Sequence, residues 1–332
     1  MLQYVARRIL IMIPTILLIS LLTFWIIQLP PGDYLTTWAA LAAAEGEAVD
    51  LQVLEHLREE YGLNEPFYVQ YWKWISRLVF RGDFGMSFYW NMRISTVIQS
   101  RMAMTLVVSV SSLIFTYALS IPIGIYSAVK QYSIGDYVAT VIGFIGVATP
   151  NFLLGIILLY ASYRITGSPL MGLFSQEYIN APWDWGRVVD LLKHLIVPTI
   201  VIGTAGTCGL IRVMRSQLLD EIKKQYVITA RAKGVGANKL LFKYPVRAAL
   251  NPIVSTIGWS LTSIFSGSTI TAIVLNLQTQ GTVLYQALLG QDMYLAGALL
   301  LILTILTVIG TLVSDIPLAW LDPRIRFGKI EA

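Results

Sequence analysis

Long uncharged runs dominate the pattern of the chain. Crossing about 30 Å of hydrocarbon takes about 20 helical residues, and six segments meet this requirement. They cover residues 9–28, 102–129, 137–163, 195–211, about 251–275, and 293–314. The fifth opens an uncharged stretch, 248–291, that is too long for one crossing, and its polar second half predicts a re-entrant or surface loop. The pattern therefore predicts an all-α polytopic membrane protein with six transmembrane helices.

The first run has a second interpretation as a signal peptide, because Arg7 and Arg8 precede it. However, its apolar stretch exceeds the roughly 7–15 residues of a signal peptide's apolar region. The small residues at 42–44 also lie too far beyond its end to serve as a cleavage site. We therefore interpret residues 1–29 as the amino terminus and the first membrane helix.

The distribution of Lys and Arg orients the spans, since short cytoplasmic loops carry the excess of both. Nine basic residues against two acidic ones lie between 212 and 247, whereas nine acidic residues against five basic ones lie between 29 and 100. We expect both termini and the loop at 220–247 to be cytoplasmic. Residues 30–101 would then form an extracytoplasmic cap, and residues 102–332 the core domain.

The predicted cap has helical periodicity over 51–61 and again over 68–80, so we expect a small folded helical domain. Aromatic residues are dense in the second segment, and such rings are enriched at membrane interfaces. They suit two roles, anchoring the cap at the interface or docking an external partner. The candidates for docking are Tyr71, Trp72 and Asp83.

Composition narrows the class of protein. Hydrophobic residues make up 56% of the 332 residues and charged residues only 13%, whereas soluble domains carry roughly 25% charge. A soluble globular protein is therefore excluded. One cysteine cannot form an internal disulfide, and His56 and His194 lack the spacing of a structural zinc site. The net charge of +5 fits membrane topology better than nucleic-acid binding, because the basic residues lie in loops between apolar runs.

Catalytic motifs are missing from the sequence. It has no G-x-x-x-x-G-K-[ST] phosphate loop and no material for a Ser/His/Asp triad, so we expect no catalytic, cofactor-binding or metal site. No span carries a charged residue in its core, which disfavours a proton-coupled carrier. A secondary carrier of a small polar solute that uses hydroxyls and backbone carbonyls remains an alternative, and a membrane-embedded enzyme is a further one.

A polar solute needs hydrogen-bonding groups along its passage. The fifth span is richest in hydroxyl side chains, of which we expect about half to hold helices together instead. At about 100° per residue, four of them fall near one face. We expect this face to line the passage: Ser255, Thr262, Ser266 and Thr269.

The most informative segment is the inner loop DEIKKQYVITARAKGVGANKLLFKYPVR at 220–247. The sequence predicts a helix over 226–233 and a second short helix over 239–244. Gly234 stops the first helix, since glycine favours the left-handed conformation of a helix end.

Two kinds of surface suit this loop. Small residues on the first helix allow it to lie in another protein's groove, with the basic rim supplying orientation. From the residues alone, a surface helix held by anionic lipid headgroups is the favoured interpretation.

The run Tyr226-Val-Ile-Thr-Ala-Arg-Ala-Lys-Gly234 resembles the EAA-type coupling loop of inner-membrane permeases of bacterial ABC importers, in the form used by the dipeptide, oligopeptide and nickel permease family. Other segments agree along the chain. They are the opening at 4–33, the GDFGMS stretch within 70–88, HLIVP at 194–198 and LDPRIRF at 321–327. The resemblance of the loop and of the DPRIR tail together favours a protein partner for the loop over lipid headgroups.

The resemblance implies a permease similar to the B-like subunit of oligopeptide permeases. Such a subunit pairs with a second homologous permease in the cell membrane, binds two cytoplasmic ATPase subunits and receives its solute from an extracytoplasmic binding protein. ATP is then bound by the partner subunits, and no cofactor is expected in this chain. The residues that the resemblance assigns to ATPase coupling are Tyr226, Thr229, Ala230, Arg231, Ala232, Lys233 and Gly234.

Two positions depart from the family's pattern. Ile228 stands where the general EAA motif has Glu, which is normal for this subfamily. After the fifth span the family commonly has an acidic residue and a Phe-x-x-Pro-Gly-x-Gly turn, whereas this chain has Ala272 and then LNLQTQG. The second departure leaves the solute open between oligopeptides and oligosaccharides, which several family members import, with metal complexes as a third class.

Overall fold

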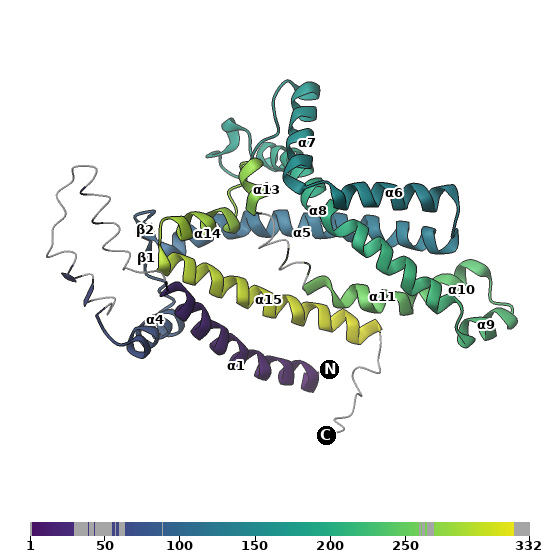
Figure 1. The fold of residues 1–332 in the computed structure, drawn as a ribbon, viewed down its shortest axis with the longest axis horizontal. Helices are drawn as coiled ribbons and strands as arrows, with labels where there is room; N and C mark the ends of the chain where they lie inside the picture. Colours follow the sequence, from purple (N-terminus) through teal and green to yellow (C-terminus); the bar gives the residue numbers. More distant parts are fainter. Residues whose placement is uncertain are drawn as a thin grey trace. The chain divides into compact units, whose positions relative to one another are not determined.

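A computed structural model describes residues 2–29, 64–87, 89–258 and 269–321, together with positions 39, 43, 55, 56, 58, 59, 260 and 263. In this part of the chain, helices dominate and the strands form one two-stranded antiparallel hairpin (Figure 1). In chain order the elements are α1 (Leu2–Ile27), α4 (Phe67–Arg81), β1 (Met86–Ser87), β2 (Met92–Arg93), α5 (Ile94–Val129), α6 (Ile134–Ala148), α7 (Asn151–Thr166), the 3-10 turn η1 (Gln176–Tyr178), α8 (Trp185–Ile222), α9 (Gln225–Ala232), α10 (Ala237–Lys243), α11 (Pro245–Ser255), α13 (Thr269–Val274), α14 (Gln280–Leu289) and α15 (Met293–Leu321).

Local sequence explains where several helices begin. Asp184 caps α8 by accepting a hydrogen bond from the Arg187 backbone N–H at 2.7 Å. Pro245 occupies the first turn of α11, where its missing N–H has no intrahelical partner to lose. Thr279 and Thr282 form a capping box at the start of α14.

Within the described residues, four helices contain stretches long and apolar enough to cross a membrane. They are Ile9–Ile26 within α1, the helices α5 and α8, and Met293–Ser314 within α15. A fifth is obtained when α6 and α7 are counted as one span. The prediction of an all-α polytopic membrane protein is therefore confirmed, and the first, second, fourth and sixth predicted spans lie in these four helices.

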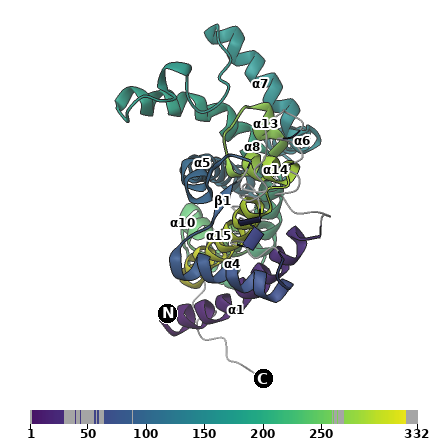
Figure 2. The same ribbon diagram turned by 90° about the vertical axis from the view of Figure 1, so that its left-hand side faces the viewer.

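The third predicted span, 137–163, is wrong as a single straight helix. Thr149 is extended, with φ −82° and ψ 121°, and α7 begins only after Pro150. Proline lacks an N–H and disfavours the helical conformation in the residue before it, so the helix breaks here. The axes of α6 and α7 differ by 103°, and Figures 1 and 2 show α7 turning away from α6.

The fifth predicted span, 251–275, also differs from the structure. α11 ends at Ser255, because the backbone N–H and the hydroxyl of Thr256 both donate to the carbonyl of Ile253, at 3.2 and 2.8 Å. Helical backbone recurs at 257, 258, 260 and 263, and α13 starts at Thr269. A one-residue turn at Thr256, which keeps right-handed helical dihedrals of φ −86° and ψ −6°, therefore separates α11 from the helical residues that follow.

The chain divides into two compact units, of which the first comprises Met1–Arg8, Thr105–Gln278 and Leu306–Ala332. Here α8 packs against α6, α7 and α11. A Cβ on Gly124 of α5 would lie 2.6 Å from the Cβ of Met214, so the absence of a side chain lets α5 approach α8 closely. The buried cluster around this contact consists of Ala128, Met214, Leu218, Val246, Ala249 and Ile253.

The second unit comprises Ile9–Met104 and Thr279–Ile305. Aromatic rings join α1 to α4 within it, where Phe24 stacks on Trp74 with ring centroids 5.3 Å apart. Since α4 covers Phe67–Arg81, the helix predicted over 68–80 is confirmed. The helix predicted over 51–61 lies almost entirely outside the described residues.

The β-hairpin of the second unit is fastened to the start of α15 by a fully buried carboxylate. Asp292 accepts a hydrogen bond from the Ser87 hydroxyl at 2.6 Å and caps α15 through the Leu295 N–H at 3.2 Å. Buried carboxylates need such donors, because an unpaired charge is costly away from water. The GDFGMS stretch of the sequence thus has a structural role in this unit.

Candidate functional site

The loop between α8 and α11 has the predicted form of a helix, a stop and a second helix. The first helix is α9 and the second is α10. Gly234 follows α9 with φ 78°, and its N–H donates to the carbonyl of Arg231 at 3.0 Å. The next residue, Val235, donates to Ala230 at 3.3 Å and closes the helix end. The prediction that Gly234 ends this helix in the left-handed conformation is confirmed.

One face of α9 packs inside the loop itself. Val227 is 1% exposed and Ala230 is 8% exposed, and both belong to one buried cluster with Leu240 of α10. Val235 and Tyr244 cover the edge of this cluster. Among the candidate coupling residues, Ala230 therefore packs against the loop rather than presenting its side chain to a partner.

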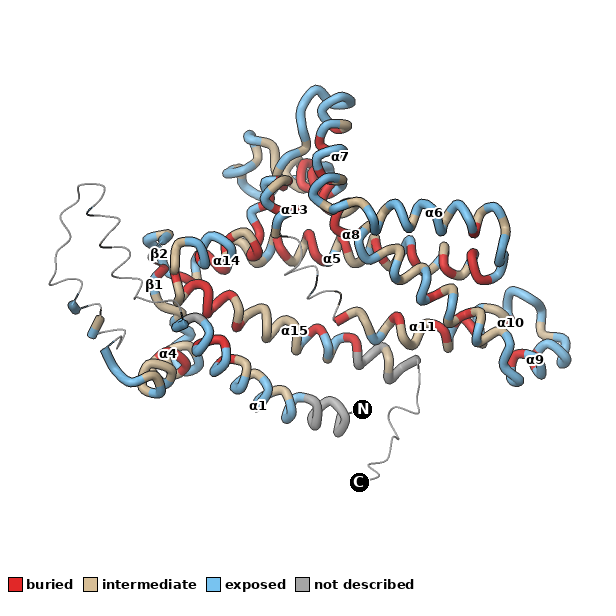
Figure 3. Tube along the Cα trace, in the orientation of Figure 1, coloured by how far each residue is buried: buried red, intermediate tan, exposed pale blue. Residues whose placement is uncertain are grey.

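The opposite face of α9 is exposed, and Figure 3 shows the exposed and buried positions alternating along this helix. Ile228 is 48% exposed at its centre, although no apolar neighbour covers it in the described loop cluster. Arg231 and Lys233 stand beside it as exposed cations. The exposed face thus combines an apolar centre with a basic rim and carries Tyr226, Ile228, Thr229, Arg231, Ala232 and Lys233.

The turn from α8 into α9 is held by one carboxylate. Glu221 accepts hydrogen bonds from the Tyr226 hydroxyl and from Lys224 Nζ, each at 2.5 Å. Burial and this hydrogen bond raise the pKa of Tyr226 above its usual value, so the hydroxyl stays protonated and remains a donor. Sequence reasoning assigned Tyr226 to the partner surface and gave Glu221 no role.

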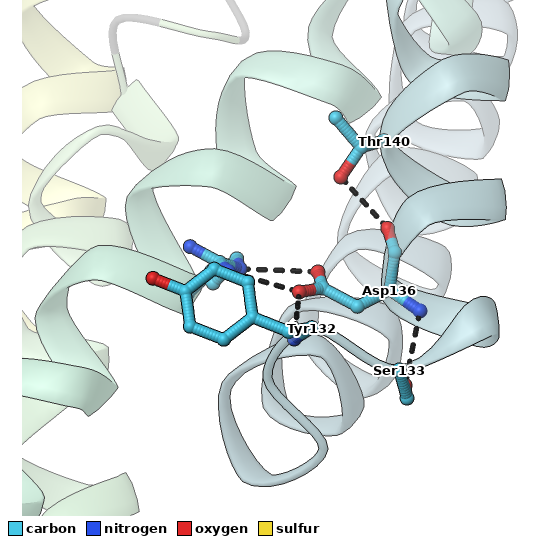
Figure 4. A network of polar contacts seen from close by, with 5 residues as sticks. Tyr132, Ser133, Asp136 and Thr140 are labelled. Atoms are coloured by element: carbon cyan, nitrogen blue, oxygen red, sulfur yellow. Dashed lines mark hydrogen bonds and ion pairs between the residues drawn. The ribbon is translucent and has the colours of Figure 1, made fainter.

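A buried ion pair joins α6 to α8, and sequence reasoning did not predict it. The Asp136 carboxylate, in a residue only 3% exposed, accepts hydrogen bonds from Arg215 Nε at 3.1 Å and Nη2 at 2.9 Å (Figure 4). It also accepts from the backbone N–H of Tyr132 at 2.9 Å, while Ser133 caps α6. The available signal was the Ser-x-x-Asp spacing at a helix start, which predicts a cap but not the partner of the carboxylate.

The four residues predicted to line the passage differ in their positions in the structure. Ser255 is the last residue of α11, and its hydroxyl donates to the carbonyl of Pro252 at 2.7 Å. Thr269 begins α13, while Thr262 and Ser266 lie outside the described residues. That the four residues share one face stays a prediction.

Other hydroxyls of the fifth predicted span join helices. The Tyr117 hydroxyl of α5 lies 3.0 Å from the Thr256 hydroxyl and 3.3 Å from the Ser260 hydroxyl. These contacts agree with the expectation that part of the hydroxyl set holds helices together.

The three candidate docking residues differ in accessibility. Tyr71 turns toward α1, since its hydroxyl lies 2.7 Å from the Ser20 hydroxyl. Trp72 is 64% exposed, and Asp83 is exposed while accepting a hydrogen bond from the Gly85 N–H at 3.0 Å. Of the three, Trp72 and Asp83 have side chains that an external partner can reach.

No group of three or more His, Cys, Asp or Glu side chains within the described ranges lies close enough together to hold a metal ion. His194, 5% exposed, instead donates a hydrogen bond from its ring Nδ1 to the carbonyl of Asp190, 3.0 Å away. Asp190 in turn accepts from the Ser175 hydroxyl at 2.6 Å. This buried set joins the segment before α8 to α8 itself.

Comparison with known proteins assigns the chain to a class. Residues 120–327 match the family described as binding-protein-dependent transport system inner membrane component, and residues 1–110 match the N-terminal family of the same transport-system membrane components. The chain is 36% identical to the oligopeptide transport system permease protein AppB of Bacillus subtilis, over 98% of this chain and 100% of that protein. It is 31% identical to the glutathione transport system permease protein GsiC of Salmonella typhi, again over 98% and 100%.

Proposed function

The chain belongs to the family of binding-protein-dependent transport system inner membrane components, and from this premise we propose that it carries peptides and receives its driving force through α9. As a member of this family it is a permease subunit of an ATP-binding-cassette importer and not an enzyme. It is a multi-pass membrane protein that works with a substrate-binding protein and with ATPase subunits.

The proposal of a peptide as solute is supported by the full-length similarity to permeases named for oligopeptides and for glutathione, a small peptide. The unusual LNLQTQG segment does not count against it, because its residues serve the fold. Leu275 and Leu277 are 1% and 2% exposed, and the Gln280 side-chain amide donates to the carbonyl of Ile98 at 3.0 Å. We therefore attribute the departure at this segment to packing rather than to a change of solute.

The solute is tested most simply on the binding protein of the same transport system. Calorimetric titration with peptide and oligosaccharide libraries should give heats of binding for peptides of a few residues and none for sugars. Saturable binding of an oligosaccharide with no peptide binding would overturn the proposed solute while leaving the family membership intact.

We base the proposed site of energy coupling on the two different faces of α9, one buried and one exposed. Val227 and Ala230 fix the helix on its own loop, and Ile228 is left exposed between basic side chains. Apolar side chains ringed by charge are typical of protein contact surfaces. A matching partner surface has an apolar depression with an acidic rim, and we assign it to the ATPase subunits.

We further infer the orientation and composition of the complex. The basic residues of the 212–247 region support a cytoplasmic position for α9 and both termini, and an outer position for α4. A second homologous permease and two ATPase subunits complete the complex, and the binding protein approaches from the side of Trp72 and Asp83.

An assembly measurement tests the docking site. In Ile228→Glu, a charge replaces the apolar centre, so the ATPase subunits should dissociate when the complex is purified in detergent. Tyr132→Glu is the matched control, because Tyr132 is 69% exposed on the turn between α5 and α6. Retention of the ATPase subunits by Ile228→Glu at the level of the control would overturn the assignment.

A further inference from the structure

The turn between α8 and α9 contains an acidic side chain that lies outside the coupling motif. Glu221 is the second-last residue of α8, and its side chain is only 13% exposed. Its two carboxylate oxygens accept hydrogen bonds from different residues beyond the turn, Oε2 from the Tyr226 hydroxyl and Oε1 from Lys224 Nζ. One carboxylate at the end of the membrane helix thus holds both the turn and the first turn of α9.

The two contacts differ in what they constrain. Lys224 is 55% exposed on a flexible stem, and exposed ion pairs of this kind contribute little. The Tyr226 contact joins a rigid ring to an ionised carboxylate, and such charge-assisted hydrogen bonds are stronger than neutral ones. It therefore fixes the direction in which α9 leaves α8.

The backbone of the turn does not fix this direction by itself. Lys224 is extended, with φ −71° and ψ 148°, and separates two helical segments. The apolar face of α9 packs on α10, within the loop, rather than on α8. Leu241 of α10 packs against the cluster that includes Leu218 of α8, and the Glu221–Tyr226 hydrogen bond adds a direct side-chain tie between α9 and α8.

We propose that Glu221 is a positioning residue for energy coupling, which acts through the Tyr226 hydroxyl to hold α9 at a fixed angle on the end of α8. A displacement imposed on α9 is then transmitted to α8 instead of being absorbed by the turn. This role rests on the proposed function, in which α9 contacts the ATPase subunits. It assigns the Tyr226 hydroxyl to the inside of the permease rather than to the partner.

The test uses the complete transport complex in proteoliposomes with its binding protein and a peptide solute. Tyr226→Phe and Glu221→Leu should each lower peptide-stimulated ATP hydrolysis roughly fivefold, as expected for loss of one partly exposed hydrogen bond, while the ATPase subunits stay bound. Glu221→Gln, whose amide oxygen still accepts a hydrogen bond, should keep most of the stimulation. Because Tyr226→Phe and Glu221→Leu remove the same hydrogen bond, the double variant should lose no more stimulation than either single variant.

Tyr132→Phe is the control, since it removes the hydroxyl of a 69% exposed tyrosine on another turn, and it should leave stimulation unchanged. Tyr226→Phe behaving like Tyr132→Phe would overturn the positioning role. So would losses that multiply in the double variant, or dissociation of the ATPase subunits from Tyr226→Phe. Ile228→Glu separates the two proposals, because it has no effect when the docking site itself is wrong and releases the ATPase subunits when only the positioning role is wrong.

Discussion

The Asp136 carboxylate and the Arg215 guanidinium form a two-point ion pair that ties the turn between α5 and α6 to α8. Arg215 lies between Met214 and Leu218, both fully buried in the cluster that joins α5, α8 and α11. The end of α8 that leads into α9 is therefore fixed to three other helices. A force applied at α9 reaches a packed block of helices and not a single free helix end.

The ion pair predicts an asymmetry between its two single variants. Asp136 is 3% exposed, whereas the Arg215 side chain is 27% exposed. Arg215→Gln leaves a buried carboxylate without its cation and should lower the free energy of unfolding by about 3 kcal/mol, while Asp136→Asn should cost about 1 kcal/mol less, because the guanidinium it leaves reaches water. Thermal unfolding in detergent micelles measures both, and equal or reversed losses would contradict the geometry.

Two nearby glycines provide a matched test of the end of α9. Gly234 has φ 78° and Gly236 has φ −57°, and a Cβ at either position would meet open space. Gly234→Val should therefore cost about 1–3 kcal/mol of backbone strain and reduce peptide-stimulated ATP hydrolysis. Gly236→Val should leave the stability and the peptide-stimulated ATP hydrolysis nearly unchanged. Equal stability and equal ATP hydrolysis in the two variants would contradict the importance of the left-handed conformation at Gly234.

A second pair of glycines tests helix packing in the membrane part of the first unit. A Cβ on Gly258 would lie 2.3 Å from the carbonyl oxygen of Gly310 on α15, whereas a Cβ on Gly209 of α8 meets nothing within 4 Å. Gly258→Ala should destabilise the protein by about 1–3 kcal/mol through overpacking against backbone. Gly209→Ala should be neutral or slightly stabilising in its helix. Loss of folded protein in detergent for the second variant but not the first would contradict the packing.

Cysteine labelling tests the proposed orientation. In a Cys208→Ala background, Tyr68→Cys on α4 should react with a membrane-impermeant maleimide in intact cells, since Tyr68 is 71% exposed and the proposed orientation puts it on the outer side. Ala237→Cys on α10 should react only after permeabilisation. The opposite order of labelling would reverse the topology and move α9 away from the cytoplasm.

Sequence reasoning predicted the fold class because membrane spans and charge bias depend on residues close together in the chain. It located four spanning helices, the two helices of the 220–247 loop and the left-handed Gly234. Hydropathy measures the length of a span and not its direction, so the 103° bend between α6 and α7 was missed.

What sequence could not predict depends on residues far apart in the chain. α8 runs from Trp185 to Ile222, well beyond the predicted span of 195–211, because its polar residues find partners inside the protein. Asp190 is satisfied by Ser175, and Arg215 by Asp136, 79 positions away. The face of α9 turned toward its own loop likewise depends on Leu240 of another helix. A motif names the residues of a helix, but packing decides which of them a partner can reach.

The most direct measurement of the central claim places a photoactivatable amino acid at single positions of the permease in the assembled complex. From Ile228 or Thr229 on the exposed face of α9, irradiation should produce a covalent product with an ATPase subunit, and from Tyr132 on the turn between α5 and α6 it should not. An assembled, transporting complex in which neither α9 position reaches an ATPase subunit would contradict the claim that α9 is where the driving force enters.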